Sequence, residues 1–168
     1  MRSIVALGLG VISIGAACGG PSAATTDADI TTYNCAADTR AETYTAGDEH
    51  MGVDGTIDVK LMSAAPAPPA RGDNSWVVQI SSMQDGVVGT PMAGLESGIV
   101  VTPYMPDHMH GTPILVEVTP VADVPGQYTL DPVNLWMPGY WTTTIAVTQG
   151  TGSAATTDKV VYKFCLSE

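Results

Sequence analysis

Short runs of β-branched and apolar residues alternate with clusters of turn-forming residues, and this pattern most limits the fold. Residues 56–61 and 141–147 alternate apolar and polar side chains with a period of two, as strands with one buried face do. Glycine and proline interrupt every candidate for an amphipathic helix. Five further strands are predicted at residues 76–80, 98–102, 114–118, 127–130 and 160–165. About seven short strands predict an all-β protein, with a single immunoglobulin-like antiparallel β-sandwich.

An apolar stretch at the N-terminus indicates an export signal. Arg2 is the only charge near the start, residues 4–14 are almost entirely apolar, and small residues follow at 15–17. The stretch is too short to cross a bilayer as a helix, so we interpret residues 1–17 as a removable signal peptide.

Cys18 lies at the expected cleavage junction. Its context, Gly-Ala-Ala-Cys, resembles the lipobox of bacterial lipoproteins, although Gly15 stands where that motif usually has leucine. The small and polar residues that follow are typical of a flexible tether, which we assign to residues 18–34. We therefore expect a lipoprotein that is anchored to a membrane through a lipidated Cys18 and faces the periplasm or the exterior. The alternative is a secreted protein with an odd thiol.

The other two cysteines, Cys35 and Cys165, lie near the two ends of the expected domain, residues 35–168. Outside the cytoplasm such thiols usually pair, and a bridge closing so long a loop stabilises by roughly 3–5 kcal/mol. Neither belongs to a Cys-x-x-Cys motif or adjoins a histidine. We therefore favour a disulfide over the alternative of a metal ligand.

Acidic residues outnumber basic residues by seventeen to six, which gives a formal net charge of −11. A general binder of nucleic acid or of anionic lipid needs a basic patch, so this composition excludes both classes. The chain has no Gly-x-Ser-x-Gly sequence and only three histidines that could act as catalytic bases. We expect a protein that is not an enzyme and whose acidic surface is compatible with binding cations.

Each histidine adjoins a methionine, in His50-Met51 and in His108-Met109-His110. Imidazole and thioether together suit copper, and Cu(I) in particular, better than Mg, Ca or Mn. In an extended segment, His108 and His110 point to one side and Met109 to the other. The ordinary alternative is that the methionines fill the core and the histidines form surface hydrogen bonds. His50, Met51 and Met109 are therefore kept only as additional candidate ligands.

Three blocks of residues extend the second cluster: Met105-Pro106-x-His108-x-His110-Gly111, Gly126-x-Tyr128 and Leu135-x-Met137-x-Gly139-x-Trp141. Their order and spacing, within residues 56–147, resemble the YtkA-like domain. That group, related to the FixH-like proteins, comprises small exported β-sandwich domains, several of them linked to copper delivery or homeostasis. The resemblance implies a copper site drawing on Met105, His108 and His110, with Met137 approaching from a later turn. Whether Asp107 and Met109 also ligate is open.

The expected function is that of a copper carrier or buffer in the cell envelope, with copper and a copper-receiving envelope protein as partners. A module of the same fold that serves envelope assembly or adhesion without metal is the alternative. The aromatic turn at residues 136–141 offers a third interpretation, a stacking platform for sugar or peptide. Strand alternation predicts that Trp141 enters the core, which leaves Trp136 or Tyr140 as the exposed ring.

Overall fold

The alternating runs fold into ten antiparallel strands within residues 33–167, the part of the chain that the computed structural model describes. The expected signal peptide and Cys18 lie outside these residues. The strands are β1 (Asp48–Met51), β2 (Ile57–Ala65), β3 (Gly72–Gln84), β4 (Val87–Pro91), β5 (Ile99–Met105), β6 (His110–Gly111), β7 (Glu117–Pro120), β8 (Gln127–Leu135), β9 (Gly139–Gln149) and β10 (Thr156–Leu166). The only helical elements in the same range are three short 3-10 turns, at Cys35–Ala37, Glu96–Gly98 and Gly152–Ala154.

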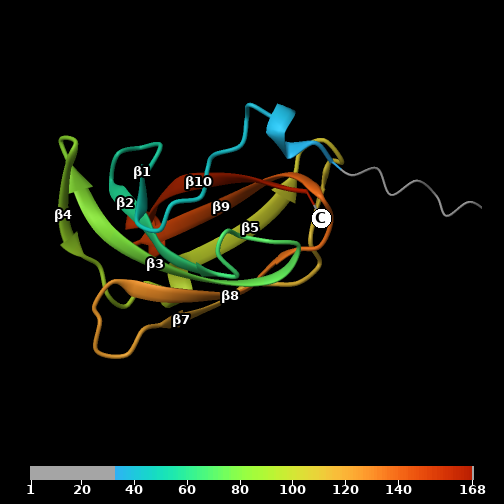
Figure 1. The fold of residues 1–168 in the computed structure, drawn as a ribbon. Coiled ribbons are helices and arrows are strands. Elements are labelled where there is room, and N and C mark those ends of the chain that lie inside the picture. Colours follow the sequence, from blue (N-terminus) through green and yellow to red (C-terminus); the bar gives the residue numbers. More distant parts are fainter. Residues whose placement is uncertain (1–32, 168) are drawn as a thin grey trace, which may run out of the picture. The chain divides into compact units, whose positions relative to one another are not determined.

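The strands form two sheets that pack as layers (Figure 1). The first has the order β1-β2-β3-β8-β7, with β4 paired to β3, and the second has the order β10-β9-β5-β6. The predicted antiparallel β-sandwich is therefore confirmed. Among residues 33–167, we find no helix of the length and apolar character needed to cross a membrane.

Period-two alternation builds the core between the layers. On β2 the side chains of Ile57, Val59 and Leu61 are completely buried, and β3 contributes Trp76 in the same way. Burying an aliphatic side chain of this size stabilises the fold by about 1.5–3 kcal/mol, so these runs hold the two sheets together. Trp141 also enters the core, as predicted, with only 1% of its surface exposed.

Four strands differ from the prediction: β7 begins late, and β1, β4 and β6 were not predicted. The strand expected at residues 114–118 begins only at Glu117, and the apolar Leu115 is 89% exposed in the preceding loop. Strand propensity alone does not supply a pairing partner. The edge strands β1 and β6 were not predicted, because β1 carries the charged and polar run Asp48-Glu49-His50 and β6 has only two residues.

Cys35 and Cys165 form the predicted disulfide, which joins the segment before β1 to the end of β10 across 130 residues. This bridge holds the N-terminal segment against the second sheet. Tyr33, which falls within the expected tether, also contacts the domain, since its hydroxyl lies 2.7 Å from Asp38 Oδ2 and 3.2 Å from Asp107 Oδ2, in the turn between β5 and β6. The described chain is therefore fixed to the sandwich from its first residue.

Candidate metal centre

The His108–His110 cluster lies in the tight turn between β5 and β6. The His108 amide donates to the Met105 carbonyl at 3.2 Å, and Met109 takes a left-handed backbone conformation with φ of 55°. The prediction that residues 108–110 are extended is therefore wrong. Pro106 restricts its own backbone and the chain reverses within four residues, which lets Met105 and His110 pair across the hairpin.

The turn nevertheless brings the two imidazoles together. The ring centroids of His108 and His110 are 5.6 Å apart, with the ring planes inclined by 70°. Metal–nitrogen bonds are about 2 Å long, so rings at this separation can share one ion after small side-chain rotations. His108 is exposed and His110 is half-buried, which leaves the pair open to an incoming ion.

His110 is held on two sides. Its ring stacks on the indole of Trp136, with centroids 5.4 Å apart, and its Nδ1 lies 3.1 Å from the Gly111 carbonyl oxygen. When Nδ1 carries the proton and donates it to that carbonyl, Nε2 is left with a free lone pair. Metal-binding histidines commonly use a backbone carbonyl in this way. The stack also joins the β5–β6 turn to the β8–β9 turn, which carries Met137.

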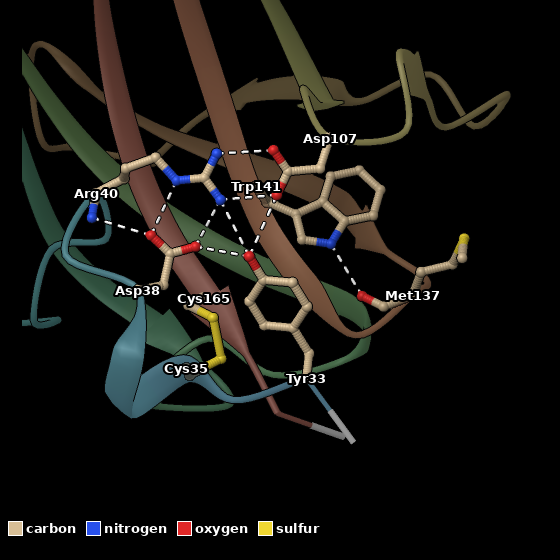
Figure 2. The surroundings of a disulfide bond; sticks show 8 residues. All are labelled: Tyr33, Cys35, Asp38, Arg40, Asp107, Met137, Trp141 and Cys165. Carbon is tan, nitrogen blue, oxygen red and sulfur yellow. Dashed lines mark hydrogen bonds and ion pairs between the residues drawn. A yellow bond between two sulfur atoms is a disulfide. The ribbon is translucent and has the colours of Figure 1, made fainter. Parts of the chain in front are cut away.

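The candidate sulfur ligands differ in accessibility. Met109 is 82% exposed, whereas Met105 is completely buried in the core. The Met105 methyl group occupies the space that Gly139 leaves by lacking a side chain. Met137 is partly buried against the core, and its side chain points away from Trp141 in Figure 2. The Met105 side chain is part of the core in this structure. It could act as the predicted copper ligand only if it left the core.

Asp107, between the motif residues, is already engaged. Its two carboxylate oxygens accept hydrogen bonds of 2.7 Å each from the two terminal nitrogens of Arg40 (Figure 2). The same guanidinium binds Asp38 and lies 4.1 Å from the ring centroid of Tyr140. Arg40 holds the pKa of Asp107 below its usual range. We call this set of Asp38, Arg40 and Asp107 the arginine clasp. It ties the N-terminal segment to the histidine turn.

Of the aromatic residues in the turn at residues 136–141, only Trp136 is exposed enough to stack on a sugar or peptide. Tyr140 is only 6% exposed beneath Arg40, whereas Trp136 is 43% exposed. One face of Trp136 is occupied by His110. The indole N–H of Trp141 donates to the Met137 carbonyl at 2.9 Å, which fixes the end of this turn. The turn thus supports the histidine pair rather than presenting a row of free rings.

His50 and Met51 do not lie together. They are neighbours on β1, and His50 faces Tyr162 of β10 while Met51 is 65% exposed. His50 is instead grouped with Glu42 and Asp48. Sequence reasoning missed both carboxylates. The Asp48-x-His50 spacing was the available signal, because alternate residues on a strand share a face.

No protein-family model matches the sequence, and no curated protein or solved structure matches it either. The resemblance to the YtkA-like domain therefore stays a prediction from the three blocks of motif residues.

Proposed function

We propose that this protein is an exported, lipid-anchored β-sandwich that binds copper and acts as a copper carrier or buffer in the cell envelope. The observation that carries the proposal is the pair of facing imidazoles of His108 and His110 on an accessible turn. The exposed thioether of Met109 stands between them in the sequence. Imidazole with thioether is a ligand set suited to copper.

The accessibility of the pair favours transport or buffering over a structural role. A structural metal site is closed by protein ligands and contributes folding energy, whereas this turn is already fixed by Trp136 and by the arginine clasp. An ion bound at an open turn can pass to a receiving protein of the envelope. Met109 is the most exposed of the three candidate sulfur ligands, followed by Met137 and then Met105.

The anchoring proposal rests on the sequence alone. Acylation of Cys18 predicts that the protein partitions into the membrane fraction and that Cys18→Ser releases it or blocks its processing. A wild-type protein recovered wholly in the soluble fraction, with an unmodified Cys18 at its N-terminus, would contradict the anchor.

Copper binding is tested by titrating the purified protein with Cu(I) and with Cu(II) in the presence of a competing chelator. The His108→Ala/His110→Ala variant should bind copper about ten- to a hundredfold more weakly, since both imidazoles are removed. Met109→Leu keeps the volume and removes the sulfur, so it should weaken Cu(I) more than Cu(II).

Met62→Leu is the matched control, because Met62 is a partly exposed methionine on β2, outside the motif. It should leave both affinities unchanged. Circular dichroism checks that each variant keeps the β-sandwich. A double histidine variant that binds copper as tightly as the wild type would overturn the proposal and favour the interaction module without metal.

A further inference from the structure

A second group of candidate ligands lies far from the histidine turn in the sequence, where the edge strand β1 of one sheet meets the edge strand β10 of the other. One ligand atom each from Glu42, Asp48 and His50 lies within 4.8 Å of the other two. His50 Nε2 is 3.3 Å from Asp48 Oδ2 and 3.7 Å from Glu42 Oε2. All three side chains are partly exposed, so an ion can enter.

The backbone and the core position each of these side chains. Asp48 and His50 are alternate residues of β1, paired with Leu61 and Val59 on the core-facing side of β2. The His50 ring lies against Tyr162, with centroids 4.3 Å apart, which sets the direction of its nitrogen atoms.

Glu42 is oriented separately, by the backbone of β10. Its Oε2 accepts a hydrogen bond of 3.1 Å from the Lys163 amide, and its own amide donates to the Lys163 carbonyl at 2.7 Å. Carboxylates that bind metals are characteristically held by such additional hydrogen bonds. The Lys163 ammonium, 3.7 Å from Glu42 Oε1, leaves Oε2 as the oxygen that faces His50.

A simple ion pair accounts for only part of this arrangement. A ring nitrogen has one proton or one lone pair and directs it toward a single partner, yet two carboxylates face His50 Nε2. A cation placed between the three side chains would bind the imidazole and both carboxylates. One imidazole with two carboxylates lacks the soft sulfur that Cu(I) prefers, and the imidazole favours a borderline ion over Mg or Ca. Zn²⁺ accepts nitrogen and carboxylate ligands and keeps a fourth position for water.

We propose that Glu42, Asp48 and His50 form a Zn²⁺-binding site that joins the edge strand β1 to the segment lying along β10. The site is independent of the copper proposal, because it shares no residue with the His108–His110 pair. Bound Zn²⁺ connects β1 to the segment that carries Glu42, and that segment is hydrogen-bonded to β10 through the Lys163 backbone, so the ion stabilises the folded chain.

The test is a calorimetric titration of the full chain with Zn²⁺, in the His108→Ala/His110→Ala background. About one equivalent should bind, and Asp48→Asn or His50→Ala should each weaken binding by about tenfold or more. Glu49→Gln is the matched control, since Glu49 lies between the two ligands on β1 but pairs with Lys60 on the other face. It makes the same change of charge and should leave the affinity unchanged.

Melting temperature is the second readout, because an ion that binds only the folded state raises it. Zn²⁺ should raise the melting temperature of the parent and of Glu49→Gln more than that of Asp48→Asn. Asp48→Asn retains the shape of the side chain, so it serves as the test if His50→Ala does not fold. Absence of Zn²⁺ binding in the double-histidine background would overturn the site. So would binding that Asp48→Asn leaves unchanged. Neither result bears on copper binding at the turn.

Discussion

At the scale of single residues, the buried carboxyl of Asp58 makes the stability of the fold depend on pH. It is 2% exposed on β2, and burial, followed by the nearby Glu49, raises its pKa to about 6. An aspartate in an unfolded chain titrates near about 4, so the folded state holds this proton over a wider pH range. Stability from Asp58 is therefore greatest at acid pH and is lost as the pH rises through about 6.

We expect Asp58→Asn to remove this dependence. Relative to the wild type, the variant should gain roughly 1–3 kcal/mol in free energy of unfolding between pH 4.5 and pH 7.5, because the amide never ionises. Denaturant unfolding of both proteins at the two pH values, with a chelator present, measures the difference. A difference between the two proteins that stays constant with pH would show that Asp58 ionises normally in the folded state.

The histidine pair also shows what residue spacing can predict. The i, i+2 spacing of His108 and His110 predicted that both rings lie on one side of an extended segment, whereas in the structure a turn places the rings 5.6 Å apart. The left-handed backbone of Met109 carries no sequence signal, since methionine rarely adopts it. The stack of His110 on Trp136 joins residues far apart in the chain and was equally invisible.

At the scale of elements, the arginine clasp connects the N-terminal segment to the β5–β6 turn. Arg40 binds Asp107 with two parallel hydrogen bonds, a geometry that lysine does not reproduce. We expect Arg40→Lys to loosen the turn beside His108 and to weaken copper binding by about two- to tenfold, with the fold retained.

A double-mutant cycle in the copper titration tests the clasp. Arg40→Lys and Asp107→Asn should each lower the affinity, and the two together should lower it little further, because both break one interaction. Fully additive effects, or an unchanged affinity in Arg40→Lys, would mean that the clasp does not position the turn.

Long strands with a buried face were predictable, including the edge strand β10, whereas the short edge strands β1 and β6 were not. The residues of β2, β9 and β10 alternate over a buried face, so their sequences record the burial directly. The edge strand β1 begins with the polar run Asp48-Glu49-His50, which lies in the acidic group around His50. Its sequence therefore shows no alternation of apolar and polar residues. The apolar run at Ile114 and Leu115 predicts a strand, yet it lies in the loop before β7, because the pairing of β7 with β8 stops at Glu117 and Asp131, beside Pro132, which has no N–H to donate.

At the scale of the whole molecule, the core and the disulfide fix the sandwich independently of any metal. The Cys35–Cys165 bridge was predictable from two cysteines at the ends of a domain that we expect to be exported, and its loop of 130 residues makes it a large constraint on the unfolded chain. The two candidate metal sites lie at the margins of this framework, on a turn and on an edge strand. Removing their ligands should therefore leave the core intact.

X-ray absorption at the copper edge, on the full chain loaded with one equivalent of Cu(I), shows whether His108 and His110 bind the metal. Outer-shell scattering from imidazole rings identifies histidine ligands, and we expect such scattering from the wild type and its loss in His108→Ala/His110→Ala. The second site contains no sulfur and is a poor competitor for Cu(I). A wild-type spectrum without imidazole scattering, or one that the double substitution leaves unchanged, would contradict the copper site at this turn.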